Sequence, residues 1–487
     1  MKKLISVLTV MAMTLACLSA CGPQTTTSEI IIEEGSDYVS NDGSEATGED
    51  GNTSEDGTSS SGSGTTSSGK TTANQSAATT DDRYAFMKGQ TYTMAITPEP
   101  QYKTTSFKKQ ISDFQKKYGC TIKTVELVFN DYNKMVTQQM ATGDPYDICF
   151  MHGSMFIPGS VGTIYEDMTS ALTQVDSSNL KSDWSNYFKD GSKLYAVCHA
   201  GSAYPIVMFY NKVMFEEYGL EDPLTLYKHG KWTWDKIKEI GKEVTDKDND
   251  IYFLSQNWIN LPTATNGTTG ITMENGKVVC YLNSKEYYQA LTNMKELYYG
   301  NDAIAKTMVA SDWTDEGFSK GTIFTFVQES AKYSQIAGEI SGSAAFGKKV
   351  DNLGLVPLPK NDNGKVNTGW LFGVAAGKGS DPRVAVAWAN YAATYKSPSK
   401  GKTEMSDELE EVCKSLLTGK TVFAHTGLTA VNPRTNTSNL ITGVLTENVS
   451  WAAGRGSDIS KAISDIAPVI KEGLDNALGK GNYVMAN

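Results

Sequence analysis

The chain has 487 residues, of which 39% are hydrophobic and 20% are charged, so it is long and apolar enough for two sizeable cores. Its net charge of −11 at pH 7 argues against a nucleic-acid partner, because nucleic-acid-binding domains are usually basic. The acidity is also local, since residues 22–82 alone carry twelve acidic residues and one basic residue. The net charge therefore says little about a ligand of the remaining chain.

The N-terminus has the pattern of an export signal. Two lysines precede an apolar stretch over residues 4–18 that is too short for a stable membrane span. Residues 18–22, LSACG, resemble a bacterial lipobox. This predicts a signal peptide over residues 1–20 and acyl chains on Cys21 that anchor the protein to the cell membrane, facing the extracellular side. An ordinary secretory peptide with an incidental cysteine is the alternative.

A low-complexity segment follows the signal. Residues 21–82 consist largely of Ser, Thr, Gly and acidic residues, apart from Ile30-Ile31-Ile32. Such a composition buries too little apolar surface to pack by itself, so beyond Cys21 the segment is predicted to be a disordered tether. Globular sequence is expected from residue 83 onwards.

Strands and helices alternate at the start of the globular part. A strand is predicted over 91–97, an apolar helical stripe over 107–114, a strand over 121–129, a helix after Asn130 or Asp131, and a buried strand over 146–151. This βαβαβ order is typical of a mostly parallel sheet with helices on both faces.

Further along, the stretch YPIVMFYNKVMF, residues 204–215, changes abruptly from an apolar strand to a helix. The later predicted elements are a helix capped by Thr233, a hairpin over 271–281 turning at Asn275-Gly276, a strand over 371–376, a helix begun by Asp381-Pro382, and a helix over 459–478 that contains Pro468.

Five cysteines lie in the globular part, and they lack metal-ligand spacing such as C-x-x-C. Several stand in apolar stretches, which predicts small buried hydrophobic side chains, although disulfides among them stay open. They are Cys120, Cys149, Cys198, Cys280 and Cys413.

Several segments together carry a family resemblance. FQKKYGCTIKTVEL, ATGDPYDICFM, GKWTWDKIKEIGKEVTD and LGLVPLPKNDNGKVNTGWLFGVAAGKGSDPRVAVAWANYA resemble, in order and spacing, the extracellular solute-binding proteins of ABC importers, in the maltose-binding-protein-like family of carbohydrate-binding lipoproteins. The family usually has Pro-Asp after Gly-Asp, whereas this chain has Pro145-Tyr146-Asp147.

The resemblance implies an α/β, two-lobed, periplasmic-binding-protein-like fold. Each lobe would be a mostly parallel sheet flanked by helices, with hinge crossovers between the lobes and a ligand cleft at the junction. Residues 204–209 would be one crossover, with Tyr204 at the cleft floor. The first lobe is expected to comprise 83–203 and about 365–430, and the second 204–364 and about 431–487.

The resemblance also points to candidate ligand contacts in the second half of the chain. A sugar needs flat rings for its C–H faces and planar polar groups for its hydroxyls. Gln256 and Trp258 align with a family loop that holds a carboxylate and an aromatic residue. Trp370 stands at a crossing back to the first lobe, and Gln328-Glu329 ends an apolar strand. A buried tryptophan and a solvated cap are the respective alternatives.

Further candidates follow predicted strands, where open sheets place ligand contacts. Glu99 and Gln101 follow the first strand, and His152 and Ser154 follow the third, although His152 is also compatible with a buried structural histidine. The family adds lid contacts near the C-terminus, which suggests Arg434 and Trp451 as the remaining members of the set.

Catalytic and cofactor motifs do not appear in the sequence. There is no G-x-S-x-G, no H-E-x-x-H and no glycine-rich phosphate loop. Asp246, Asp248 and Asp250 have the first spacing of a calcium loop, but Ile251 and Asn257 stand where Gly and Glu are required. A polar turn is therefore predicted, with no metal and no cofactor.

These observations predict a non-enzymatic, monomeric lipoprotein that captures a carbohydrate, such as an oligosaccharide, and delivers it to the transmembrane subunits of an ABC permease. A ligand-sensing receptor subunit, a binder of a non-sugar solute and a glycan-degrading enzyme are the alternatives. Thermal stabilisation by sugars, rather than by peptides or polyamines, would distinguish a carbohydrate-binding protein from a binder of a non-sugar solute. Turnover of a bound sugar would identify an enzyme.

Overall fold

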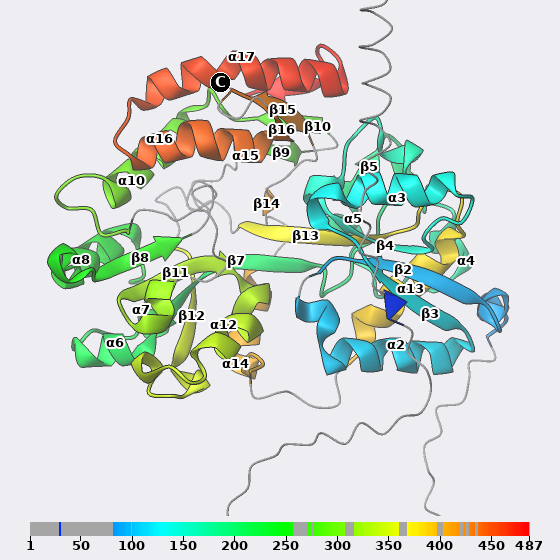
Figure 1. Cartoon of the computed structure of the whole chain (residues 1–487), viewed down its shortest axis with the longest axis horizontal. Coiled ribbons are helices and arrows are strands. Elements are labelled where there is room, and N and C mark those ends of the chain that lie inside the picture. The colour runs from blue at the N-terminus through cyan, green and yellow to red at the C-terminus, as the bar shows by residue number, and fades with distance from the viewer. Residues whose placement is uncertain are drawn as a thin grey trace, which may run out of the picture.

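The fold is built from two groups of elements that lie side by side and are joined by the long strands β7 and β13 (Figure 1). The computed structural model describes residues 29–30, 81–98, 100–256, 270–274, 277–306, 316–359, 368–396, 403–417, 422–423, 428–433 and 437–486. Among the described residues, ten strands form one mixed sheet that runs through both groups, with β1-β3-β2-β4-β13-β7-β11-β8 as its main path.

The first lobe begins with the predicted parallel unit. β2 (Thr91–Ile96) pairs in parallel with both β3 (Thr121–Glu126) and β4 (Ile148–His152). Between them run α2 (Thr105–Tyr118) and α3 (Tyr132–Ala141). The Thr104 side chain accepts a hydrogen bond from the Phe107 backbone amide at the start of α2, and Gly119 ends the helix in a left-handed conformation. The predicted βαβαβ order is confirmed.

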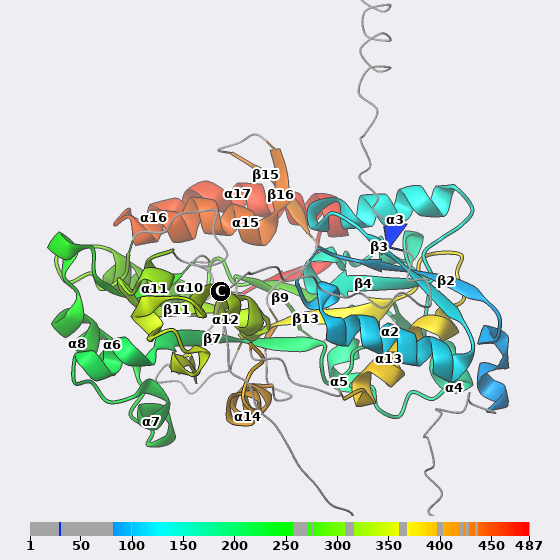
Figure 2. The ribbon, with the colours of Figure 1, turned by 60° about the horizontal axis from the view of Figure 1, so that its bottom comes forward.

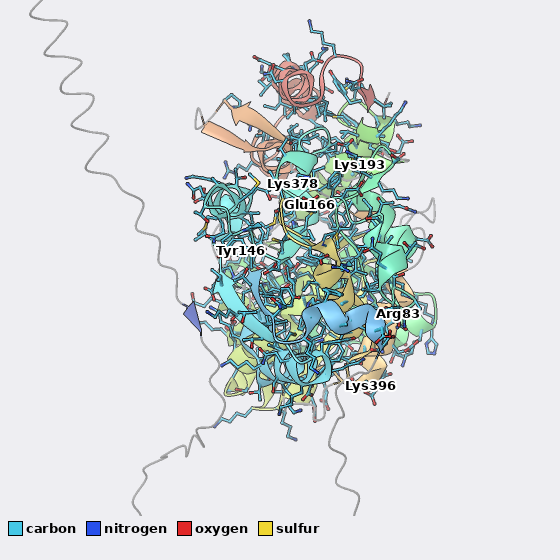
Figure 3. All side chains as sticks on the ribbon, turned by 90° about the vertical axis from the view of Figure 1, so that its right-hand side faces the viewer. Arg83, Tyr146, Glu166, Lys193, Lys378 and Lys396 are labelled. Atoms are coloured by element: carbon cyan, nitrogen blue, oxygen red, sulfur yellow. The ribbon has the colours of Figure 1, made fainter. Side chains whose placement is uncertain are left out.

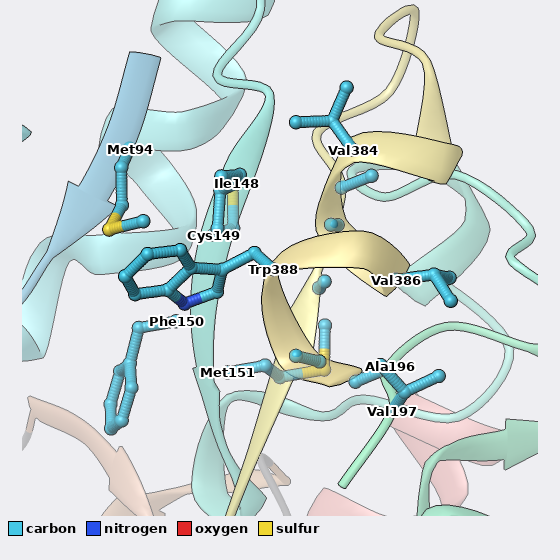
Figure 4. Close-up of a cluster of buried hydrophobic side chains, with 14 of the residues drawn as sticks. Met94, Ile148, Cys149, Phe150, Met151, Ala196, Val197, Val384, Val386 and Trp388 are labelled. Atoms are coloured by element: carbon cyan, nitrogen blue, oxygen red, sulfur yellow. The ribbon is translucent and has the colours of Figure 1, made fainter. Parts of the chain in front are cut away.

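The core of this lobe packs around a helix from much later in the sequence. α13 (Pro382–Thr394) starts at Asp381, whose side chain accepts a hydrogen bond from the Arg383 amide, as the sequence predicted. Trp388 of this helix lies beside Met94 and Phe150 (Figure 4). Its ring centroid is also 5.1 Å from that of Phe114 in α2. Distant segments of the chain thus share one apolar cluster.

Two strands carry the chain between the lobes. β7 (Ala203–Asn211) pairs with β13 (Thr368–Ala375) through residues 203–205, and with β11 (Ile323–Glu329) and β12 (Leu353–Pro357) through later residues. β13 continues from β7 onto β4. The predicted switch from strand to helix is confirmed, because α6 (Lys212–Glu217) follows β7 at once, with the Asn211 side chain as its N-cap.

The second lobe adds β8 (Tyr252–Gln256) in parallel with β11. The Thr233 side chain caps α8 (Trp234–Val244), as predicted, by accepting a hydrogen bond from the Lys236 amide. The lobe also contains α7 (Pro223–Lys228), α11 (Glu316–Lys320) and α12 (Tyr333–Ile340). Its sheet is mixed rather than mostly parallel, since β7 is antiparallel to both β11 and β12.

A third apolar cluster lies above the second lobe, where α15, α16 and α17 form one layer in both views (Figures 1 and 2). Its elements are β9 (Ile271–Glu274), β10 (Lys277–Cys280), α10 (Lys285–Tyr298), α15 (Ile441–Leu445), the π-helix η11 (Thr446–Ser450), α16 (Trp451–Gly454), α17 (Ile459–Leu478) and β17 (Tyr483–Met485). The predicted hairpin strands and the helix containing Pro468 are both present.

Shorter elements complete the fold, and two of them differ from expectation. α14 (Asp407–Leu416) packs into the apolar core of the second lobe through Leu409, Cys413 and Leu416, although we expected residues up to about 430 in the first lobe. β1 (Glu29–Ile30) pairs with the edge strand β3, within the segment predicted to be a disordered tether. The others are α4 (Ala171–Gln174), α5 (Ser182–Ser185), β5 (Lys189–Asp190), β6 (Lys193–Leu194), β14 (Val422–Phe423), β15 (Thr429–Asn432) and β16 (Thr437–Leu440).

The five cysteines of the globular part are buried free thiols, which confirms their interpretation as small apolar side chains. Burial raises the pKa of the Cys120 thiol to about 11 and that of the Cys413 thiol to about 12.

At the outer end of the first lobe, the Lys378 ammonium lies 3.0 Å from a Glu166 carboxylate oxygen (Figure 3). Of the helices described here, none combines the length and the apolar character needed to cross a membrane.

Candidate ligand-binding site

A cluster of aromatic rings lies where β4, β13 and β7 meet. The antiparallel ladders place Phe372 opposite His152 and Trp370 opposite Tyr204. Residues directly opposite each other share a face of the sheet, and Trp370 and Phe372 are two positions apart on one strand. These four residues therefore share one face at the junction of the lobes.

The ring distances confirm that these residues are in contact. The His152 ring centroid lies 4.7 Å from that of Trp370 and 4.9 Å from that of Phe372. Tyr204 lies 5.3 Å from Phe372, and Phe129, which precedes α3, lies 5.3 Å from His152. We refer to these five residues as the junction cluster. All four separations are typical of attractive edge or tilted ring packing.

The junction cluster connects the cores of the two lobes. His152 is buried at the carboxyl end of β4, with 1% of its surface exposed. Phe372 packs against the first-lobe core, whereas Trp370 is partly buried against the second-lobe core. Tyr204 is half-buried. Trp370 and Tyr204 thus combine a fixed backbone position in the sheet with partial exposure of the side chain, as a ring that contacts a ligand requires.

Charged and amide groups lie on the neighbouring strand β11. Glu329, its last residue, is opposite Ile206 in β7, which shares a face with Tyr204 and is about 7 Å from it along the strand. The Lys332 ammonium is 3.8 Å from a Glu329 carboxylate oxygen, with 9% and 13% of these two side chains exposed. The register therefore places Glu329 on the same face as the junction cluster, with Lys332 as its largely buried ion-pair partner.

Gln328 occupies the opposite face from Glu329, because successive strand residues alternate. It is opposite Val207, has 2% of its surface exposed, and accepts a hydrogen bond of 2.9 Å from the Glu329 backbone amide. The sequence had proposed both residues as ligand contacts. The geometry places their side chains on opposite faces, and a ligand-binding role for either residue stays a prediction.

Thr97 is a candidate that the sequence reasoning did not select. It follows β2, is fully buried, and its hydroxyl lacks a hydrogen-bond partner within the described part of the chain. An unsatisfied buried hydroxyl costs about 1–3 kcal/mol, which a ligand group or a water molecule can offset. Because β2 and β4 are parallel neighbours, Thr97 lies at the same edge of the sheet as His152. The rule that selected Glu99 and Gln101 also covers Thr97.

The remaining sequence candidates are only partly covered. Glu99, Trp258 and Arg434 lie outside the described residues. Backbone positions are described for the others: Gln101 in the 3-10 turn Pro100–Lys103, Ser154 in the turn Gly153–Met155 after β4, Gln256 at the end of β8, and Trp451 at the start of α16. Gln256 is registered with Val327 of β11.

The acidic turn over residues 246–250 is held by internal contacts. Asp246 accepts hydrogen bonds from the backbone amides of Asp248 and Asn249, and the Lys306 ammonium lies 2.7 Å from Asp250. These contacts account for the turn as a structural element. Within the described ranges, no group of three or more His, Cys, Asp or Glu residues is placed to hold a metal ion.

The arrangement suits binding of a polar solute that also has apolar faces. Rings offer flat C–H contact surfaces, and Glu329, paired with Lys332, offers a charged acceptor on the same face. The residues come from strands of both lobes, so a ligand that contacts them would favour whichever lobe arrangement brings them together.

One protein-family model matches most of the chain that forms the two lobes. The family described as bacterial extracellular solute-binding protein matches residues 98–397. This range contains β4, β7, β11 and β13, and so covers the strands that build the junction cluster. No curated protein sequence matches the chain.

Solved structures match almost over their full length. The ABC substrate-binding protein Lmo0181 of Listeria monocytogenes, solved with cycloalternan, is 18% identical with a TM-score of 0.58, covering 79% of this chain and 99% of its own. The galacto-N-biose/lacto-N-biose I-binding protein of Bifidobacterium longum, solved with lacto-N-biose, is 14% identical with a TM-score of 0.60, covering 81% and 98%. At these identities the likeness shows the fold, which is the predicted two-lobed α/β architecture.

Proposed function

This chain belongs to the bacterial extracellular solute-binding proteins, and from that premise we propose that it captures a carbohydrate between its two lobes and delivers it to an ABC permease. The observation that carries the proposal is the junction cluster, in which rings from both crossing strands share one face with Glu329. Rings and planar polar groups are the two contact types that a sugar needs.

The proposed mechanism is a population shift between open and closed lobe arrangements. A ligand that contacts Trp370 and Tyr204 on the crossing strands and Glu329 on the second lobe stabilises the arrangement in which all three face it. Among similar structures, those from Listeria monocytogenes and Bifidobacterium longum were solved with cycloalternan and lacto-N-biose. These bound ligands make oligosaccharides the first ligand class to test.

The experiment is a thermal-shift screen of the mature protein against oligosaccharides, polyols, peptides and polyamines. A true ligand at a hundred times its Kd stabilises the folded state by about 2.7 kcal/mol, which is well within the range of the method. Stabilisation by a sugar is the expected result. Stabilisation by a peptide or polyamine with no response to any sugar would overturn the carbohydrate assignment.

We also propose that Cys21 carries the lipid that holds the protein on the extracellular face of the cell membrane, with residues 22–82 as its tether. The supporting observation is the sequence LSACG at residues 18–22. Replacing Cys21 with Ala is expected to release the protein from the membrane fraction. Mass spectrometry of the mature N-terminus would show an acylated Cys21, whereas an unmodified N-terminus elsewhere would contradict the proposal.

A further inference from the structure

The third apolar cluster is attached to the second lobe through one continuous helix. Tyr287, Leu291 and Met294 of α10 lie in the third cluster, whereas Leu297 and Tyr298 at its C-terminal end lie in the second-lobe core. A single helix with buried side chains in both clusters cannot bend between them without losing backbone hydrogen bonds. The third cluster therefore moves with the second lobe.

The same cluster contacts the first lobe at two apolar side chains. Met273 of β9 is partly buried against both the third cluster and the first-lobe core. Ile157 of the first lobe is partly buried against the third cluster. These two contacts join the lobes at a place separate from the crossing strands β7 and β13.

Ile157 is held rigidly on the first lobe. It lies between Phe156 and Val161, which are 0% and 1% exposed in the first-lobe core. The Val161 amide donates a hydrogen bond of 2.9 Å to the Ile157 carbonyl, and the Gly159 amide donates one of 2.8 Å to an Asp190 carboxylate oxygen. The loop follows β4, whose last residue is His152, so its position is coupled to the junction cluster.

We propose that Met273 and Ile157 form an interlobe clasp, which holds the two lobes together in the absence of ligand and thereby sets the affinity for the ligand. The predicted effect on affinity rests on the proposed function, which supplies the ligand. The predicted effect on the distance between the lobes does not depend on a ligand. Both side chains are half-buried, and part of their apolar surface is buried by the contact between the third cluster and the first lobe.

The clasp acts through the equilibrium between open and closed lobes. The apparent Kd equals the intrinsic Kd divided by the fraction of molecules already competent to bind. Removing apolar contact from the closed state lowers that fraction and weakens binding by the same factor, without changing any group that contacts the ligand. We expect truncation of Met273 to raise the apparent Kd about fivefold. This corresponds to a modest share of the free energy gained by burying a whole apolar side chain.

The test measures the interlobe distance directly. Exposed Lys116 and Glu217, one on each lobe, are replaced with cysteine and spin-labelled, and the distance between the two labels is measured by electron paramagnetic resonance. The described native thiols are buried and should react slowly with the label. Met273→Ser is expected to lengthen the interlobe distances of the ligand-free protein. It should also weaken binding about fivefold for the sugar identified by thermal shift.

Met485→Ser is the matched control. Met485 is a partly buried methionine that packs against the third cluster but not against the first-lobe core, so its replacement should leave the distances and the affinity unchanged. Ile157→Ala should reproduce the Met273→Ser result. In the double variant, the ligand-free lobes should be at least as far apart as in either single variant, because both substitutions remove apolar contact between the third cluster and the first lobe.

Two outcomes overturn the clasp. One is a wild-type distance distribution in the ligand-free Met273→Ser protein, and the other is equal opening in Met273→Ser and Met485→Ser. Neither outcome requires a bound sugar, so failure of the clasp is distinguishable from failure of the carbohydrate assignment. If no sugar binds the wild-type protein, the distances of the ligand-free variants still decide the conformational part.

Discussion

The two halves of β7 differ in burial and in partners. Residues 203–205 pair with β13 and include the half-exposed Tyr204, whereas residues 206–211 are buried between β11 and β12. The buried half fixes the strand in the second lobe, and the crossing half carries a ring at the junction. Substitutions in the buried half should therefore affect folding, and those at the crossing should affect binding.

The largest expected effect lies in the buried half. Gly354 of β12 is opposite Tyr210, and a Cβ at this position would lie 2.1 Å from a Tyr210 ring carbon. Gly354→Val should destabilise the protein by about 3 kcal/mol, because neither the central strand nor the ring can move without disturbing the core. Urea unfolding measures this loss.

Gly338→Ala provides the control for that substitution. Gly338 lies on the exposed side of α12, and a Cβ there would meet nothing within 4 Å. Alanine should stabilise the helix by about 1 kcal/mol. If Gly354→Val unfolds at the same urea concentration as the wild type, the buried half of β7 is not packed as described.

At the crossing, Trp370→Ala should weaken ligand binding by about 2 kcal/mol, or roughly thirtyfold, because central tryptophans carry much of the affinity of a site. The free energy of unfolding should change less than the binding energy, since Trp370 is only partly buried. Titration calorimetry measures the first quantity and urea unfolding the second.

Trp370→Phe sharpens this result, because it keeps a ring next to His152 and should retain more of the affinity than the alanine variant. Equal losses in both variants would show that the indole itself, rather than ring stacking, is required. An unchanged affinity in Trp370→Ala would remove the junction cluster from the binding site.

A smaller effect tests one hydrogen bond in the buried half. The Tyr210 hydroxyl donates to an Asp222 carboxylate oxygen at 2.7 Å. Tyr210→Phe should lower the free energy of unfolding by about 1 kcal/mol and leave ligand binding unchanged. Tyr218→Phe is the comparison, because Tyr218 is 45% exposed and should not respond. A loss of affinity in Tyr210→Phe would contradict the division between the two halves of β7.

The smallest effect is expected where β7 ends and α6 begins. The Lys212 ammonium donates to the Asp351 carbonyl at 2.9 Å, at the surface of the molecule. Lys212→Met should change the free energy of unfolding by less than about 0.5 kcal/mol, as is usual for surface positions. A loss above 1 kcal/mol in thermal unfolding would mean that this end of β7 depends on the contact more than its exposure implies.

Local elements were largely predictable from the sequence. The caps at Thr233 and Asp381 and the strand-to-helix change at Asn211 all appear as expected. Each depends on a hydrogen bond or an apolar period between residues close in the chain, so the necessary information is local. The pairing of β1 with β3 was not predicted, because strand pairing is a non-local property.

The sequence predicted where several candidate residues lie, but not how they are arranged together, and their role in binding stays a prediction. His152, Tyr204, Trp370 and Glu329 were selected at strand ends and crossings, and the structure brings them to one face of the sheet. Sequence reasoning did not separate Glu329 from Gln328, because their faces depend on the register with β7. It also did not select Thr97, whose unpaired hydroxyl is visible only once its surroundings are known.

By itself, the sequence determined the family, the alternation of helices and strands, and the caps that begin several helices. Only the tertiary structure decided which rings meet at the junction, which of two adjacent polar residues faces them, and that Met273 and Ile157 connect the lobes. The reason is strand register: side chains alternate with a period of two, so a slip of one residue moves every side chain to the other face. That register is set by the packing of all the cores together rather than by neighbours in the chain.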